Sequence, residues 1–221
     1  RTNAIGIANG LAWTSIGGET LPIEVQVMDN GSGKITVTGS LGDVMKESAQ
    51  LAVTYVRVHA NEYGIDPERL KKCDLHIHAP EGAVPKDGPS AGVTLTTALV
   101  SCLSGIPVRG DVAMTGEITL HGNVLPIGGL REKSMAAYRE GMKTVLIPKD
   151  NVSDLYEVDD EVKKNIQFLP MSNLAQVLNA ALLKPKTVSA RHSHPGKKAK
   201  KPADAAAIPQ TTEQPKPGAV C

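Results

Sequence analysis

Two kinds of hydrophobic pattern run through the first 183 residues of the chain. Short alternating or fully apolar runs predict strands at residues 24–27, 35–37, 74–78, 112–116, 120–126 and 144–147. Apolar residues at helical spacing predict helices at residues 44–63, 90–103 and 174–183, and a further helical segment that opens at 128–133 and ends near Gly141. The mixed order, without clean strand–helix–strand repeats, predicts an α/β (α+β) fold.

A turn at residues 29–33 separates the first two predicted strands, and we expect a hairpin there. The sequence Gly31-Ser32-Gly33-Lys34 within this region resembles part of a phosphate-binding loop. That loop requires glycine at position 28 and serine or threonine at position 35, and the chain has Met28 and Ile35 instead. The motif therefore fails, and a hairpin turn is the preferred interpretation.

The composition changes at about Lys184, where lysine, proline, alanine and glutamine begin to dominate. Such a segment cannot bury a core, so we expect one folded domain at residues 1–184 and a disordered tail at residues 185–221. The basic cluster Gly196–Lys201 is a candidate for weak contact with nucleic acid or anionic surfaces. A solvated tail is the preferred interpretation of that cluster.

The overall composition excludes several classes of protein. Aromatic residues make up only 3% of the chain, so the core must be built from aliphatic side chains and methionine. The net charge of +1 gives no general attraction to nucleic acid or membrane, and no apolar stretch is long enough to span a bilayer. Cys73, Cys102 and Cys221 show no metal-binding or redox spacing, and the chain has no signal-peptide pattern, so we expect the cytoplasm. Because the first residue is Arg1, we expect a piece of a longer chain.

The segment Pro85–Gly92 carries the strongest chemical signal in the sequence. Asp87 and Gly88 suit a turn, and Pro89 suits the first turn of a helix, where a missing N–H group has no cost. Ser90 is therefore expected at a helix start, among backbone N–H groups and the positive end of the helix dipole. Such a place can stabilise an oxyanion, which makes Ser90 a candidate nucleophile.

A serine nucleophile needs a base, and the histidines are poorly placed to supply one. They are His59, His76, His78, His121, His192 and His194. Two lie in the tail, one in a predicted turn, one on a long predicted helix and two on a predicted strand. Gly88–Gly92 does match the serine-hydrolase elbow G-x-S-x-G, but Pro89 and the absence of a preceding predicted strand do not fit that strained turn.

Lys133 is the other candidate base. Helical spacing puts it on a similar face to three other residues, Leu130, Ala137 and Tyr138. Burial on that face would lower the pKa of the amine and suit it to general-base chemistry. The alternative is that the amine extends along the helix to solvent, and spacing alone favours this alternative.

Several segments closely resemble the proteolytic domain of Lon, the ATP-dependent protease, in its soluble A-type form. They are residues 10–14, 38–42, 76–82, 85–92, 115–120 and 124–133. The resemblance extends from about Gly10 to about Leu183, and its most specific part is the block Pro-Lys-Asp-Gly-Pro-Ser-Ala-Gly. It implies a compact α/β proteolytic domain of the ribosomal-S5-domain-2-like type.

The resemblance also implies roles for individual residues. The nucleophile of the family maps onto Ser90, its catalytic lysine onto Lys133, and a threonine that could orient the amine onto Thr115. Asp87, together with Gly88 and Pro89, would support the serine. For Asp87 itself two roles stay open, a cap on its own helix, which is favoured, and a group that repositions to regulate access to Ser90. For Trp13 a peptide groove and simple packing stay open.

The implied function is that of a serine endopeptidase that degrades unfolded or misfolded proteins. This domain would need no metal and no organic cofactor, whereas ATP and Mg²⁺ would bind in an ATPase module that we expect upstream. The family assembles as a six-membered ring, so we expect homo-hexamers of the full-length protein.

Three alternatives to this interpretation remain. His76 and His78 share one face of a strand and could bind a metal, but no third ligand accompanies them at a usable spacing. A small-molecule kinase of the GHMP type has a similar Pro-Ser-Ala-Gly helix start, but it should carry a longer Gly-Ser-rich phosphate loop. A non-catalytic module that binds nucleic acid or a partner chain would not need a lysine that meets the serine.

Overall fold

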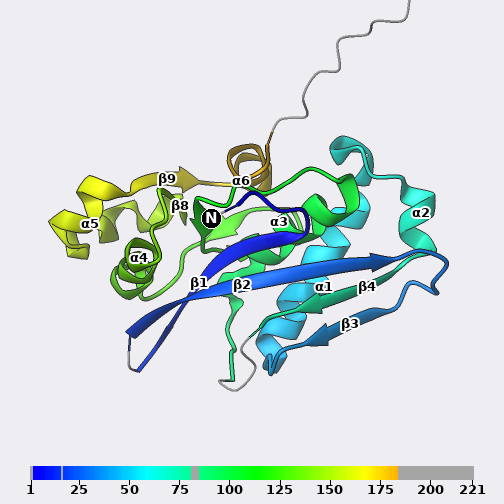
Figure 1. Cartoon of the computed structure of the whole chain (residues 1–221), viewed down its shortest axis with the longest axis horizontal. Coiled ribbons are helices and arrows are strands. Elements are labelled where there is room, and N and C mark those ends of the chain that lie inside the picture. The colour runs from blue at the N-terminus through cyan, green and yellow to red at the C-terminus, as the bar shows by residue number, and fades with distance from the viewer. Residues whose placement is uncertain (1, 16, 81–84, 184–221) are drawn as a thin grey trace, which may run out of the picture. The chain divides into compact units, whose positions relative to one another are not determined.

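A computed structural model of the chain describes residues 2–15, 17–80 and 85–183 (Figure 1). The predicted tail at residues 185–221, with its basic cluster and two of the histidines, lies outside the described residues. Within the described ranges, no helix has the length and apolar character needed to span a membrane.

The centre of the fold is a mixed seven-stranded sheet in the order β3-β4-β2-β1-β5-β8-β9. Its strands are β1 (Ile7–Thr14), β2 (Gly17–Met28), β3 (Ile35–Thr38), β4 (Asp74–His78), β5 (Val112–Met114), β8 (Thr144–Pro148) and β9 (Gln167–Met171). The β1–β2 and β2–β4 pairs are antiparallel, whereas the other four neighbouring pairs are parallel. A separate antiparallel pair joins β6 (Glu117–Ile118) to β7 (Val124–Leu125). This architecture confirms the predicted α/β fold class.

Helices cover the two faces of this sheet unequally. The α-helices are α1 (Asp43–Val58), α2 (Pro67–Lys71), α3 (Gly92–Ser104), α4 (Leu130–Arg139), α5 (Asp160–Asn165) and α6 (Leu174–Ala181). Three 3₁₀ segments accompany them, η1 (Ala60–Tyr63), η2 (Pro89–Ala91) and η3 (Lys149–Glu157). In Figure 1, α1 lies behind β2 and β4, and α3 lies behind β1.

Successive residues of β5 and β8 belong to two different hydrophobic clusters. Met114 and Leu146 pack with α1, α3 and α6, whereas Ala113 and Val145 pack with α4 and α5. Because successive strand residues point to opposite faces, the two clusters lie on opposite sides of the sheet. Helices α3 and α4 therefore approach the same strands from opposite faces.

The sequence-based predictions of individual elements were partly wrong. The long helix predicted at 44–63 ends at Val58, because His59 leaves the helical conformation, and a short 3₁₀ segment follows. The strand predicted at 120–126 is reduced to β7, because a turn at Leu120–His121 occupies its first part. No prediction covered β1, β9, α2 or α5.

The predicted hairpin at residues 29–33 is also wrong, although the turn exists. Strands β2 and β3 do not pair, because β4 lies between them. Asp74 at the start of β4 holds the turn, since its Oδ1 accepts hydrogen bonds from the N–H groups of Ser32 and Lys34 at 2.8 Å each. These amides already bind a carboxylate, so the turn is no phosphate cradle.

Close contact between β2 and α4 makes a small residue necessary at Gly18. A Cβ atom there would collide with the backbone carbonyl of Glu132, and the Gly18 carbonyl accepts a hydrogen bond from Arg139 Nη2 at 2.6 Å. Gly18→Ala should therefore lower the free energy of unfolding by about 1–3 kcal/mol, because the backbone of α4 must move. Urea denaturation measures the change.

Gly128→Ala is the matched control for this substitution. A Cβ atom at Gly128 would meet no heavy atom within 4 Å, so the free energy of unfolding should change by less than about 0.5 kcal/mol. Equal stability of the Gly18 and Gly128 variants would contradict the proposed packing constraint.

Candidate active site

Ser90 lies in η2, the 3₁₀ turn that directly precedes α3. Gly88 supplies the required backbone conformation, with φ at +121°, and Pro89 occupies the first position of the turn. The segment before it forms only an isolated bridge between Lys86 and Leu41, so no strand leads into the serine from the described residues 85–88. The rejection of the serine-hydrolase elbow agrees with this geometry.

The residues that follow β5 hold the serine turn in place. The Ser90 carbonyl accepts a hydrogen bond from Gly116 N–H at 2.8 Å, and the Gly116 carbonyl accepts one from Val93 N–H at 3.2 Å. Thr115, directly after β5, is fixed by a hydrogen bond from its N–H group to the Leu146 carbonyl at 3.1 Å. The end of β5 is therefore a fixed point for both the Ser90 backbone and the Thr115 side chain.

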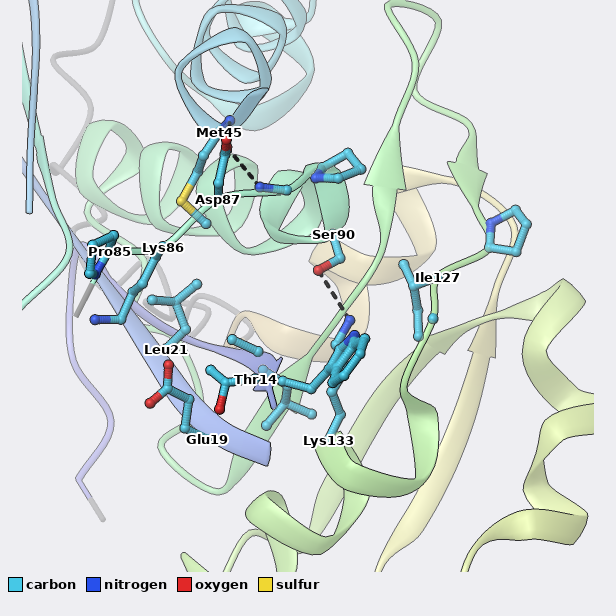
Figure 2. Close-up of a pocket in the computed structure, with 17 residues that line it drawn as sticks. Thr14, Glu19, Leu21, Met45, Pro85, Lys86, Asp87, Ser90, Ile127 and Lys133 are labelled. Carbon is cyan, nitrogen blue, oxygen red and sulfur yellow. Dashed lines mark hydrogen bonds between the residues drawn. The ribbon is translucent and has the colours of Figure 1, made fainter. Parts of the chain in front are cut away.

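Lys133 reaches the same point from the other face of the sheet. Its Nζ lies 3.1 Å from Ser90 Oγ and 3.2 Å from Thr115 Oγ1. Figure 2 shows the Ser90 hydroxyl and the Lys133 amine directed at one another. The side chain is only 2% exposed, so the solvent-directed lysine that spacing alone favours is wrong. The amine stays inside because α4, which carries Lys133, packs against β1 and β2.

Burial lowers the pKa of Lys133 from 10.5 to about 8. Desolvation of the ammonium is the cause, and the amine has hydroxyl groups rather than a carboxylate as its hydrogen-bond partners. A lysine with this pKa carries an appreciable neutral fraction near neutral pH, and a neutral amine can accept a proton. The arrangement can therefore deprotonate a hydroxyl without any histidine.

A pocket of about 390 Å³ opens onto these side chains. Its walls come from β1, the start of β2, the first turn of α1, the serine loop and the loop before α4. The lining residues are Leu11–Thr14, Glu19, Leu21, Met45, Pro85–Ser90, Pro126–Gly128 and Lys133. Sequence reasoning missed Met45, Glu19 and the loop at 126–128 as lining residues, because nothing in their local pattern indicates that they meet here.

Trp13 packs against the start of α4 and also lines the pocket, and its role in a peptide groove stays a prediction. It lines the pocket while 55% of its surface is exposed. It also packs on the start of α4, where a Cβ atom at Gly129 would collide with the indole ring. Gly129 further needs its positive φ of +69° to begin the helix. The tryptophan thus forms a partly exposed wall next to the helix that carries Lys133.

The favoured role of Asp87 was wrong. The start of η2 has no side-chain cap, and Asp87 Oδ1 instead accepts hydrogen bonds from Met45 N–H at 3.0 Å and from Gly88 N–H at 2.8 Å. Met45 belongs to the first turn of α1, 42 residues earlier in the chain. Asp87 therefore caps a different helix, a pairing that local sequence could not reveal.

Three of the four histidines in the described ranges, His59, His76 and His78, have other partners. His59 Nδ1 lies 2.9 Å from Glu62 Oε1. His76 and His78 both hydrogen-bond to the Thr38 hydroxyl, at 2.9 and 2.7 Å. Over residues 2–15, 17–80 and 85–183, no cluster of three or more histidine, cysteine, aspartate or glutamate residues could hold a metal ion.

Burial of the Lys133 amine should make stability depend on pH. Between pH about 8 and 10.5 the unfolded lysine keeps a proton that the folded one has released, so stability rises with pH in this window. Lys133→Met removes this dependence. The stability of the variant relative to wild type should therefore fall by up to about 3 kcal/mol as the pH rises from 7 to 10.5. Urea unfolding at several pH values measures it, and parallel curves would contradict a buried amine with a lowered pKa.

Comparison with known proteins agrees with this geometry. A family model for the Lon protease (S16) C-terminal proteolytic domain matches residues 1–184. The chain is 56% identical over 184 residues to a Lon protease of Brevibacillus choshinensis, a match that covers 83% of this chain and 24% of that protein. It is 55% identical over 194 residues to a Lon protease of Syntrophomonas wolfei, covering 88% of this chain and 24% of that protein.

The chain thus spans about a quarter of the length of the curated relatives that it matches. The family match covers all of the described residues, including the serine turn, the end of β5 and the start of α4. The chain belongs to the Lon protease family and corresponds to its C-terminal proteolytic domain.

Proposed function

We propose that this domain is a serine endopeptidase in which Ser90 is the nucleophile and Lys133 the general base. The observation that carries the proposal is the 3.1 Å approach of the Lys133 amine to the Ser90 hydroxyl at a site where the lysine is 2% exposed. A distance within hydrogen-bond reach and a pKa of about 8 are the two properties that a general base requires at neutral pH.

Acylation begins when the neutral Lys133 amine takes the proton of the Ser90 hydroxyl. Ser90 Oγ attacks the peptide carbonyl carbon and forms a tetrahedral intermediate. The Lys133 ammonium then gives its proton to the leaving nitrogen, the C–N bond breaks, and an ester to Ser90 remains. Thr115 orients the amine, because a hydrogen bond from Nζ to Thr115 Oγ1 aims the nitrogen lone pair at Ser90.

Deacylation repeats these proton transfers with water in place of serine. Lys133 accepts a proton from the attacking water, and Ser90 recovers its proton when the ester bond breaks. Backbone N–H groups hold the oxyanion in both steps. The N–H groups of Gly92 and Val93 are already bonded to Pro89 and Gly116, so we place the oxyanion donors before Gly92 in the chain.

We propose that substrates bind as extended, unfolded peptides along β1. One edge of β1 pairs with β2 along the whole strand. The other edge pairs with β5 only at Asn9 and Gly10, and the β1 residues that line the pocket come after Gly10. The other edge of this part of β1 faces the pocket and can pair with a peptide strand. A folded protein cannot present such a strand, and this supports selection for unfolded or misfolded chains.

For the full-length protein we propose ATP-dependent degradation in the cytoplasm. An ATPase module with ATP and Mg²⁺ would unfold substrates and deliver them to a homo-hexamer of these domains. The proteolytic domain itself would need no metal and no organic cofactor, because the Lys133 amine supplies the base. Contact of the basic cluster at Gly196–Lys201 with nucleic acid stays a prediction.

Loss of either reacting group should abolish peptide hydrolysis. Ser90→Ala and Lys133→Ala should each lower kcat for an unstructured fluorogenic peptide by roughly a thousandfold or more. The double variant should be no worse than the single ones, because the two groups act as a unit. Hydrolysis by the variants at the wild-type rate, or none by the wild-type chain, would contradict the proposed dyad.

The rate should follow deprotonation of Lys133. Because only the neutral amine can accept the serine proton, kcat should rise with pH and level off above a midpoint near the pKa of about 8. Steady-state kinetics between pH 6 and 10 measure the profile. A profile that is flat across the alkaline range would exclude Lys133 as the base of the rate-limiting step.

A further inference from the structure

The loop that carries the serine is hydrogen-bonded to a segment 45 residues earlier in the chain. Lys86 N–H donates to the Ser40 carbonyl at 3.1 Å, and Gly42 N–H donates to the Lys86 carbonyl at 2.8 Å. Leu41 and Lys86 thereby form a parallel bridge directly before α1. The start of α1 and the approach to Ser90 are thus joined by their backbones.

The Asp87 carboxylate adds a second connection at the same place. The residue before α1, Gly42, has no side chain and gives the helix no cap. Asp87 Oδ1 takes over this role by accepting the Met45 N–H at 3.0 Å. A carboxylate at the positive end of a 16-residue helix is favourable in charge as well as in geometry. Figure 2 shows Asp87 beside Met45, with Ser90 farther along the same loop.

A glycine is needed at position 42 because a side chain there would not fit, and not because the backbone has an unusual conformation. Its φ of −70° is ordinary for any residue. A Cβ atom at Gly42 would nevertheless collide with the Asp87 carboxylate. The absence of a side chain at position 42 therefore leaves the room that the Asp87 carboxylate occupies.

Only two residues separate this anchored carboxylate from Ser90, and both are restrained. Gly88 N–H is bonded to the same Asp87 Oδ1 at 2.8 Å, and its φ is +121°. Pro89 has a ring that restricts its own φ. A displacement of Asp87 would consequently be transmitted to Ser90, whose other side is held by Gly116.

We propose that Asp87 and Gly42 form a clamp that positions Ser90 within reach of Lys133. Asp87 is a positioning residue that acts through the start of α1, whereas the Lys133 amine bonds to Ser90 and Thr115. The proposal rests on the proposed dyad, because it assigns Asp87 to the placement of its nucleophile. It predicts that a substitution of Gly42, which lies outside the serine loop, has the same effect as removing the Asp87 carboxylate.

Four variants of the chain test the clamp. Asp87→Ala removes the carboxylate. Gly42→Ala keeps the Asp87 carboxylate but pushes it out of its place. Asp87→Asn keeps an oxygen that can accept the Met45 N–H, so it should restore function. Asp43→Ala is the matched control, because it removes a carboxylate from the first turn of the same helix without touching the clamp; the Asp43 side chain is 97% exposed.

The first measurement is hydrogen exchange of the Met45 amide by NMR, which does not depend on activity. Exchange should accelerate at least tenfold in Asp87→Ala and Gly42→Ala and stay near the wild-type rate in Asp87→Asn and Asp43→Ala. Unchanged protection of Met45 in Asp87→Ala would overturn the clamp itself.

The second measurement is peptide hydrolysis, with kcat corrected for the folded fraction. Asp87→Ala and Gly42→Ala should lower kcat by on the order of ten- to a hundredfold, as expected for a misplaced nucleophile. KM should change little, and the midpoint of the pH profile should stay near that of wild type, because Lys133 is not altered. Asp87→Asn and Asp43→Ala should stay within about threefold of wild type.

The outcomes separate this proposal from the proposed function. Wild-type kcat in Gly42→Ala with an unprotected Met45 amide would overturn the positioning role while leaving the dyad intact. Activity that survives Ser90→Ala would instead overturn the dyad. A loss of kcat in Asp43→Ala equal to that in Asp87→Ala would show that charge at the helix start, and not the clamp, is responsible.

Discussion

The proposed chemistry of this domain depends on an amine that is held away from water between two hydroxyl groups. Lys133 is 2% exposed, and its Nζ contacts Ser90 Oγ and Thr115 Oγ1. An ammonium in such a place loses hydration that two neutral hydroxyls cannot replace, and the result is a pKa of about 8. A carboxylate at the same position would hold the proton on the amine and remove its capacity to act as a base.

The fold brings these groups together at the end of one strand. Helices α3 and α4 cover opposite faces of the sheet, so Ser90 and Lys133 approach from different sides and meet just beyond β5. Thr115 follows β5 directly and contacts both of them. Close packing of Gly18 against the backbone of Glu132 sets the distance of α4 from β2. The precision of the site therefore depends on the sheet and its two covering helices as well as on the loop that carries the serine.

Two of the strands that sequence patterns did not reveal owe their conformation to their neighbours. Strand β1 contains Asn9 and Gly10, which are poor strand formers, and it is held by pairing with β2 on one side and β5 on the other. Strand β9 contains Pro170, which argues against a central strand but is tolerated here because β9 is the last strand of the sheet. Each strand also has a partner that is distant in sequence, β5 for β1 and β8 for β9, and local patterns carry no signal for such pairing.

Local sequence alone was sufficient to place Ser90 at a helix start, since Gly88 and Pro89 impose the conformation of the turn through their own backbones. The helix that bears Lys133, the α/β class and the resemblance to Lon also followed from the sequence. Whether the Lys133 amine is buried was decided only by tertiary packing, because a helical face does not reveal what covers it. The same holds for Asp87, whose partner lies 42 residues away and became its neighbour only when α1 and the serine loop came together. Backbone preferences act within a few residues and can be read from the sequence, whereas desolvation and long-range hydrogen bonds arise only from the folded arrangement.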